Sequence, residues 1–303
     1  MQDHLQQAAD HRKGLAITAI GGLTLTVDIP LIRLAESDAW SALAVRSALT
    51  FLAAIVAWSF IRFALKRTIP IIPGKAGLLV VTLYGLASIT FMLAVFNTST
   101  ANLVFILAFN PMFSALLAWW LTGESPLPQT FAAMIVMILG VSLIVFDGLK
   151  AGNLTGDLLA LASSFILAGA ITASRKARVD MGFAPLFAAI VPSMIGLAMV
   201  GGPSGLVLGD PVWLVLNGLI IIPIAFWCLA TGPRYLSGPE VAMFYLLETI
   251  LAPVWVWMIF AEAPTPLGLV GGAIIVVALV SHSLWRLSSH RKAARTLAPR
   301  HPV

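Results

Sequence analysis

Two stretches of this sequence resemble each other and indicate how the chain folds. Residues 99–126 are STANLVFILAFNPMFSALLAWWLTGESP, and residues 237–264 are SGPEVAMFYLLETILAPVWVWMIFAEAP. Each stretch has a small, polar start, an apolar run with one proline, and a Glu-x-Pro sequence at its end, after which a Gly-rich apolar run follows. The alignment pairs Glu124 with Glu262, Pro126 with Pro264, and Asn110 with Glu248.

Apolar runs of this kind recur along the whole chain and are long enough to cross a membrane as helices. A bilayer core needs about 20 apolar residues in helical form. The runs are too long for the strands of a membrane barrel and lack the alternating polarity of such strands. We therefore expect an all-α membrane protein with ten transmembrane helices, at 14–34, 39–61, 75–96, 99–121, 128–146, 154–174, 184–202, 212–233, 240–260 and 266–285.

The composition excludes the soluble classes of protein. Of the 303 residues, 59% are hydrophobic and 10% are charged, and the mean hydropathy is +0.97. A soluble domain is about 25% charged, and a chain this apolar has more apolar surface than it can bury inside itself. The single cysteine, Cys228, excludes an intramolecular disulfide and a multi-cysteine metal site.

The basic residues predict the orientation in the membrane. With ten helices, 15 of the 18 Lys and Arg residues lie on one side, whereas Arg33 and Lys150 lie on the other and Arg46 lies within a helix. Cytoplasmic loops carry the excess of Lys and Arg, so both termini are expected in the cytoplasm of a bacterium, with the chain in the inner membrane. Because these residues are spread over short loops, no nucleic-acid partner is expected.

The similarity of the two stretches suggests an internal repeat of five helices, at 14–146 and 154–285, between tails at 1–13 and 286–303. An odd number of helices makes the second copy enter the membrane from the opposite side, so the halves form an inverted pair. In transporters such pairs enclose a site near the midplane, often at helices interrupted by Pro or Gly. The interior prolines are Pro30, Pro111, Pro192, Pro223 and Pro253.

Ten helices in two repeats, short loops and a Glu-x-Pro turn after the fourth and ninth helices resemble the drug/metabolite transporter superfamily. More narrowly, the chain resembles its EamA-type exporters and, among these, the aromatic amino-acid exporters of the YddG type. The resemblance implies a central cavity lined by both halves, export of amino acids or related metabolites, and outer, supporting positions for the fifth and tenth helices.

Two ionisable residues lie at equal depth on consecutive helices. With a rise of about 1.5 Å per residue, Asp28 and Arg46 lie about 9 and 10 Å from the outer ends of the first and second helices. A charge at such depth needs a partner or water, so an Asp28–Arg46 ion pair is expected. Such a pair either only fixes the packing of two helices or also contacts the substrate.

Glu248 lies about 12 Å into the ninth helix and has no obvious basic partner in the sequence. It either takes up a proton, binds a substrate ammonium group, or is a protonated carboxyl group bonded to a neighbouring helix. Tyr245 lies one turn earlier on the same face. For each of the remaining candidates, the sequence does not decide between a role in helix packing and a contact with the ligand. The candidate substrate-binding residues are Glu248, Asn110, Tyr245, Tyr84, Trp227, Asp28, Arg46, Ser163 and Ser164.

These features favour a secondary transporter that works by alternating access on a small-molecule substrate. A channel or facilitator for small solutes and an exporter of drug-like cations remain alternatives. Scattered single ionisable groups do not suit an enzyme, and no phosphate-binding motif, cofactor or metal site is expected. Facilitated diffusion and proton exchange both stay open. Membrane lipid is an expected partner, and Gly268 and Gly272 have the GxxxG spacing of either helix packing or a homodimer seam.

Overall fold

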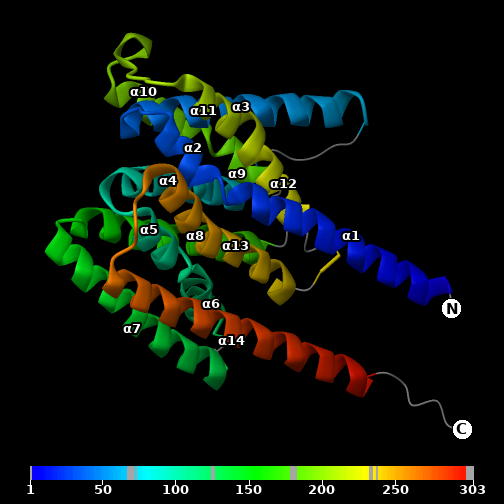
Figure 1. Cartoon of the computed structure of the whole chain (residues 1–303). Helices are drawn as coiled ribbons and strands as arrows, with labels where there is room; N and C mark the ends of the chain where they lie inside the picture. The colour runs from blue at the N-terminus through cyan, green and yellow to red at the C-terminus, as the bar shows by residue number, and fades with distance from the viewer. Residues whose placement is uncertain are drawn as a thin grey trace, which may run out of the picture.

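The computed structural model describes residues 2–66, 72, 74–123, 127–177, 183–231, 235–236 and 238–297. All regular structure within these residues is helical, and none of them lies in a strand (Figure 1). Eight helical segments of the described chain are long and apolar enough to cross a membrane. Two shorter apolar helices, at 184–199 and 244–260, lie within the two remaining predicted segments. The all-α prediction is confirmed, and the chain is a multi-pass membrane protein.

The described residues of the first half of the chain form seven helices, some of which are pieces of one predicted span. They are α1 (Gln2–Leu25), α2 (Asp28–Leu34), α3 (Ala39–Phe63), α4 (Gly74–Asn97), α5 (Thr100–Leu107), α6 (Asn110–Thr122) and α7 (Pro128–Ala151).

The second half contains the remaining elements. Its elements are α8 (Leu154–Ala177), α9 (Ala184–Phe187), α10 (Ile190–Met199), the short 3₁₀ turn η1 (Pro203–Gly205), α11 (Pro211–Leu216), the π-helix η2 (Asn217–Ile221), α12 (Ile222–Thr231), α13 (Gly238–Phe260) and α14 (Pro266–Leu297). Helices α1 and α14 continue far into the predicted tails, because neither 2–13 nor 286–297 contains Pro or Gly to break them.

Three predicted spans are each divided into two helices. Turns separate α1 from α2, α5 from α6 and α9 from α10, and a proline follows each turn closely: Pro30, Pro111 and Pro192. Proline has no N–H donor and its ring clashes with the carbonyl group four residues earlier, so the helix cannot continue normally. In a fourth span Pro223 follows the π-helix η2, whereas Pro253 lies inside the continuous helix α13.

The helices pack in antiparallel and crossing pairs (Figure 1). Helix α7 lies along α14, α3 along α10, α4 along α8, and α1 along α12. The α7–α14 contact depends on two glycines, since a Cβ atom on Gly140 would lie 2.7 Å from the Gly271 carbonyl oxygen, and a Cβ atom on Gly271 equally close to that of Gly140.

The Gly268 and Gly272 pair is used inside the chain. A Cβ atom on Gly268 would lie 3.2 Å from Oδ1 of Asn102, and one on Gly272 would clash with the ring of Phe105. Both glycines thus face α5, so their spacing allows α14 to pack closely against α5 within one copy of the protein. These two glycines therefore do not support a homodimer, which remains a prediction.

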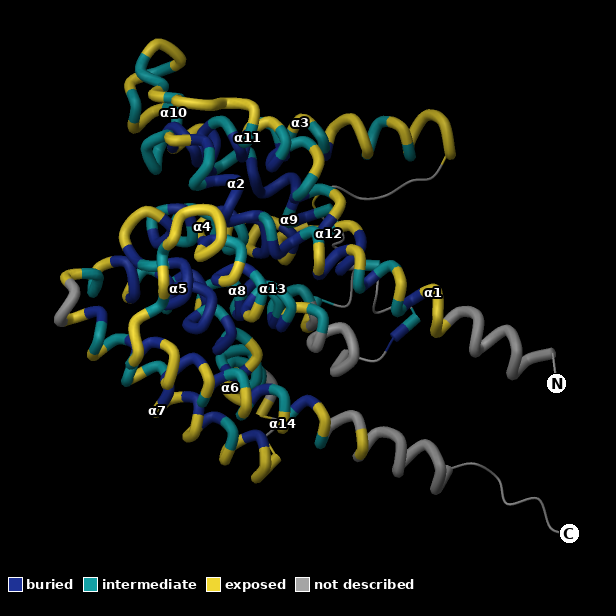
Figure 2. The backbone as a smooth tube through the Cα atoms, viewed as in Figure 1, coloured by how far each residue is buried: buried dark blue, intermediate teal, exposed yellow. Residues whose placement is uncertain are grey.

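Burial follows the pattern of a membrane protein. Helices α2 and α5 are buried along most of their length, inside the assembly of helices (Figure 2). Large apolar side chains are exposed along α3, α4, α7 and α14, where lipid is the available solvent.

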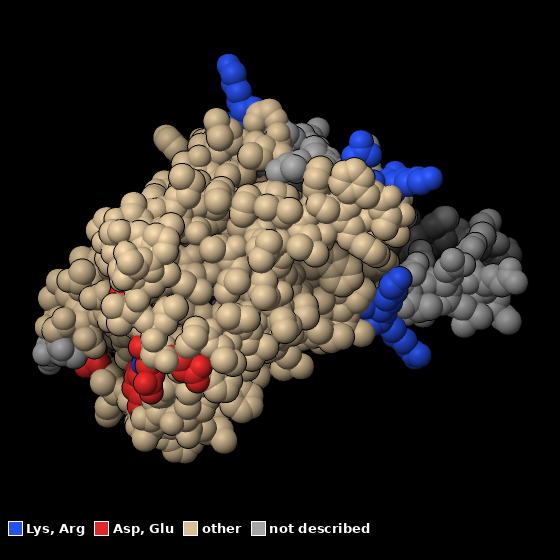
Figure 3. Space-filling view, turned by 90° about the horizontal axis from the view of Figure 1, so that it is seen from above, with Lys and Arg blue, Asp and Glu red and all other residues tan. Residues whose placement is uncertain are grey.

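The described charges separate along the helix axes. Acidic side chains gather at one end of the molecule, and most Lys and Arg side chains lie toward the end that holds both termini (Figure 3). We call the first the acidic end; its connections carry Glu36, Asp38, Asp210 and Glu262, and Asp147 lies in the last turns of α7. The described basic side chains of the other end are Arg12, Lys13, Arg62, Lys66, Lys75 and Lys176. Outside the described residues lie Glu124 and Pro126 of the repeat and Arg67, Arg178, Arg234 and Arg300.

Candidate functional site

The predicted ion pair between the first two spans is present. Nη2 of Arg46 on α3 lies 2.9 Å from Oδ2 and 3.0 Å from Oδ1 of Asp28, the first residue of α2. Only 3% of Asp28 and 8% of Arg46 are exposed. A buried charge that loses its partner is strongly destabilising, so the break between α1 and α2 holds Asp28 where Arg46 neutralises it.

Asn217 joins the eighth predicted span to this pair. Its Nδ2 donates to Oδ1 of Asp28 at 2.7 Å and to the Asp28 backbone carbonyl oxygen at 3.1 Å. Its Oδ1 accepts from Nε of Arg46 at 2.8 Å. Gly218 permits the close approach, because a Cβ atom there would lie 2.7 Å from the Arg46 carbonyl oxygen.

The sequence analysis missed Asn217. The available signal was a lone amide side chain inside the apolar run 212–233, directly before a glycine. It is the first residue of the π-helix η2 and is fully buried. π-Helical turns are rare and are frequently found at functional sites.

One edge of the Arg46 guanidinium group stays open. Its Nε and Nη2 are used by Asn217 and Asp28, whereas Nη1 makes no hydrogen bond to any described residue and is not sealed from solvent. The ring centroid of Phe91 lies 5.7 Å from the guanidinium carbon. Nη1 carries two N–H donors, so this edge can bind an anionic group.

Glu248 on α13 belongs to the same polar region. It is partly exposed, and it interacts electrostatically with both Asp28 and Arg46. Because Arg46 is already paired with Asp28, Glu248 has no cation of its own among the described residues, and its carboxyl group makes no hydrogen bond to any of them. It is open to a proton or to a ligand ammonium group.

Two tyrosines complete this region. Tyr245 interacts electrostatically with Tyr84 on α4 and with Glu248. Although these side chains meet inside the helix assembly, 43% of the surface of Tyr245 is accessible, and Tyr84 and Glu248 are partly accessible too. We call Arg46, Glu248, Tyr84 and Tyr245 the central site.

The other candidates lie at helix junctions in this conformation. Nδ2 of Asn110 donates to the Ser164 carbonyl oxygen at 2.8 Å. Oγ of Ser164 lies 3.5 Å from the Leu107 carbonyl oxygen, which has no helical donor because residue 111 is proline. Ser163 donates to the Ala87 carbonyl oxygen at 3.0 Å. These groups fasten α8 to α4 and to the break between α5 and α6.

Trp227 on α12 is 56% exposed. In the part of the chain that the structure describes, none of the hydrogen bonds of the central polar groups involves it.

A second polar cluster lies at the acidic end. Arg33 forms an ion pair with Glu262, and Nη2 of Arg33 also donates to the carbonyl oxygens of Val95, at 3.3 Å, and Thr98, at 3.1 Å. Oε1 of Glu262 accepts from the backbone nitrogen of Thr100 at 3.1 Å. The acidic residue of the second Glu-x-Pro sequence thus contacts the first half of the chain.

Asp157 lies beside this cluster and was also missed, because a carboxylate three residues into a predicted helix looks like an ordinary boundary residue. It is fully buried; Oδ1 accepts from the Thr98 hydroxyl at 2.5 Å, and Oδ2 has no partner among the described residues. No group of three His, Cys, Asp or Glu side chains in the described segments is arranged to hold a metal ion.

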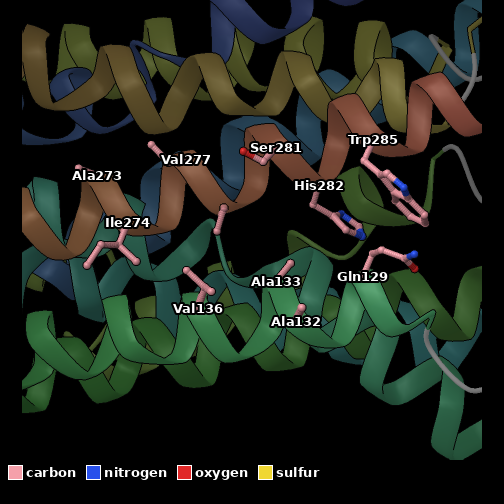
Figure 4. Close-up of a pocket in the computed structure, with 11 residues that line it drawn as sticks. Gln129, Ala132, Ala133, Val136, Ala273, Ile274, Val277, Ser281, His282 and Trp285 are labelled. Atoms are coloured by element: carbon pink, nitrogen blue, oxygen red, sulfur yellow. The ribbon is translucent and has the colours of Figure 1, made fainter.

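A groove of about 620 Å³ between α7 and α14 is a separate feature (Figure 4). Most of the residues that line it are apolar, with Gln129, His282 and Trp285 at one end. Nε2 of His282 lies 2.9 Å from Oγ1 of Thr130. The groove contains no residue of the central site and its walls do not suit a polar substrate.

Comparison with known proteins supports a transporter. Residues 154–283 match the model of the EamA-like transporter family, which is not a family of enzymes. A solved structure, titled "Crystal structure of protein", aligns with a TM-score of 0.62 and 17% identity over 91% of this chain and 98% of that chain. At this identity the likeness shows the fold alone. No curated protein matches the chain. The family match over the second half supports membership of the drug/metabolite transporter superfamily and indicates a membrane transporter of that type.

Proposed function

We propose that the protein is a secondary transporter that exports amino acids or related small metabolites across the bacterial inner membrane by alternating access. The observation that carries this proposal is the pair of opposite, unsatisfied groups in the central site. Nη1 of Arg46 is an open donor, and Glu248 is a carboxyl group without a cation of its own among the described residues.

An α-amino acid matches these two groups. Its carboxylate accepts charge-assisted hydrogen bonds from the guanidinium group of Arg46, and its ammonium group pairs with Glu248. Tyr84 and Tyr245 offer aromatic faces to a side chain, which favours aromatic or other neutral amino acids and agrees with the narrower resemblance to the YddG type. A drug-like cation needs Glu248 alone and leaves the open edge of Arg46 unused.

Alternating access requires two halves that move against each other, and the helix contacts support an inverted repeat. In an inverted repeat, each span has its counterpart five spans away in the other half. When each helix is replaced by its counterpart, the α4–α8 contact becomes the α12–α1 contact, and the α6–α8 contact becomes the α13–α1 contact. The α3–α10 and α7–α14 contacts each turn into themselves. This pattern is expected of two copies related by a two-fold axis.

The separation of charge supports an orientation with the termini in the cytoplasm. The described Lys and Arg side chains concentrate at the end with both termini, and the acidic end is then outside.

Flux of a panel of radiolabelled amino acids through liposomes with the purified protein tests the proposal. We expect saturable uptake and accelerated exchange when unlabelled substrate is loaded on the opposite side. A matched panel of organic cations is the control. Flux that does not saturate would favour a channel, and flux of the cations without the amino acids would overturn the amino-acid assignment.

A further inference from the structure

One ion pair connects several helix ends at the acidic end. Arg33 lies in the last turn of α2, and Glu262 lies in the connector 261–265 between α13 and α14. The side chains that form the pair are 19% and 31% exposed. The connector thus contacts the end of the first span, far away in the sequence.

The pair also caps two further helices. Arg33 donates to the carbonyl oxygens of Val95 and Thr98 at the C-terminal end of α4, where carbonyl groups lack helical partners and the helix dipole is negative. Glu262 accepts from the nitrogen of Thr100 at the positive N-terminal end of α5. The cation and the anion therefore each sit at the helix end that suits their charge.

We propose that Arg33 and Glu262 form the outer gate of the transport cavity, and that this gate is closed in the structure. The gate opens when the connector leaves α2 and the α4–α5 turn, which admits the outside solution to the central site. This inference rests on the orientation proposed above and adds to the proposed function the residues that close one side.

The exposure of the two ion pairs found among the described residues decides which one opens. The side chains of Arg33 and Glu262 are partly exposed, so water hydrates the two charges when they separate and replaces most of the lost interaction energy. Asp28 and Arg46 are almost fully buried, and their separation would leave buried charges without partners. The central pair is therefore a fixed element, and the outer pair is the one able to break and form during a cycle.

The connector is held differently at its two ends. Near its C-terminal end the hydroxyl group of Thr265 contacts Asp147 of α7 and accepts from the nitrogen of Gly268 at 3.0 Å. At its N-terminal end Ala261 has a φ of 54°, a left-handed conformation that is unfavourable for a residue with a Cβ atom. The contacts of Glu262 hold this strained end in place, so movement about Thr265 is the expected opening.

Accessibility of the central site from outside tests the gate without any substrate. The reporter is Tyr245→Cys in a Cys228→Ser background, reacted in intact cells with a membrane-impermeant thiol reagent. The gate variants are Arg33→Gln, Glu262→Gln and the double variant. Glu36→Gln is the matched control, because the side chain of Glu36 is exposed at the same end and makes no hydrogen bond or ion pair with the described residues.

We expect each single gate variant to speed labelling by about fivefold, the effect of losing a partly exposed ion pair on an opening equilibrium. The double variant should label no faster than the faster single variant, since both remove one interaction. The control should label at the rate of the unmodified gate.

Unchanged labelling in both single variants, additive effects in the double variant, or an equal increase in Glu36→Gln would each overturn the gate. If a Gln variant does not fold, Arg33→Lys and Glu262→Asp keep the charges but change the reach of the pair, and a smaller increase is expected. Failure of amino-acid flux in liposomes leaves this measurement unaffected, so the two proposals fail separately.

Discussion

The side-chain amide nitrogen of Asn217 lies 2.7 Å from Oδ1 of Asp28, so the π-helix of one span is bonded to the first turn after the break in another. This bond brings a neutral donor to a carboxylate that Arg46 already neutralises. The cluster is therefore saturated around Asp28, while Nη1 of Arg46 makes no hydrogen bond to the described residues.

Breaking the central pair should be strongly destabilising. Asp28→Asn or Arg46→Gln alone leaves a buried charge without its partner, and we expect each to lower the free energy of unfolding by about 3–5 kcal/mol. The double variant should recover part of the loss, because no charge is then stranded. Thermal denaturation of the detergent-solubilised protein measures both effects, and strictly additive losses would count against the pair.

Asn217→Ala should lower stability by about 1–3 kcal/mol, because it removes hydrogen bonds from two buried charged groups. Asn217→Asp should be worse than Asn217→Ala, since it adds a second buried anion beside Asp28. Thermal denaturation under the same conditions compares the two. A more stable Asn217→Asp variant would show that Asp28 alone does not neutralise the charge of Arg46.

Glu248→Gln should keep the fold and abolish transport or its dependence on pH. The carboxyl group has no hydrogen bond to the described residues that the substitution removes, whereas a substrate ammonium group or a transported proton needs the charge. Flux into liposomes at several pH values measures the effect, with Glu36→Gln as the control. A native rate and a native pH profile would make Glu248 structural and favour uncoupled diffusion.

Gly140→Ala should weaken the α7–α14 contact, because the new Cβ atom would lie 2.7 Å from the Gly271 carbonyl oxygen. Overpacking of this kind typically costs about 1–3 kcal/mol. Gly169→Ala is the matched control, since its nearest neighbour would be 3.8 Å away. Melting temperatures of the two variants in detergent give the comparison, and equal melting temperatures would contradict the close contact.

Asp38 should contribute a pH-dependent part of the stability of α3. Burial tends to raise the pKa of this carboxyl group, but hydrogen bonds from Ser41 and Trp40 outweigh it and lower the pKa. Because the folded pKa is lowered, the contribution is present above the unfolded value of about 3.9 and is lost as pH falls through the folded value.

Asp38→Ala should remove this N-cap at a cost of about 1 kcal/mol near neutral pH. Asp38→Asn should keep most of the cap and lose the pH dependence. Denaturation curves between neutral pH and pH values below about 3.9 test both expectations. A wild-type contribution that grew on acidification would reverse the sign and refute the cap.

Much of this architecture follows from local properties of the sequence. The length of an apolar run, the side on which Lys and Arg collect and the position of a proline each depend on a few neighbouring residues and on lipid as solvent. The all-α class, the segments that form spans and the breaks near Pro30, Pro111 and Pro192 were accordingly predictable. The Asp28–Arg46 pair was predictable too, because equal depth on consecutive helices restricts the choice of partner.

Only the tertiary structure decided the contacts between segments that are distant in sequence. Asn217 reaches the central pair from 171 positions beyond Arg46, Glu262 meets Arg33 from 229 positions away, and Asp157 is buried against Thr98. Ser163, Ser164 and the Gly268–Gly272 spacing looked equally suited to packing and to binding until their neighbours were known. Hydrogen bonds act over about 3 Å, so their partners depend on how the helices are rotated and paired, and periodicity along one helix does not contain that information.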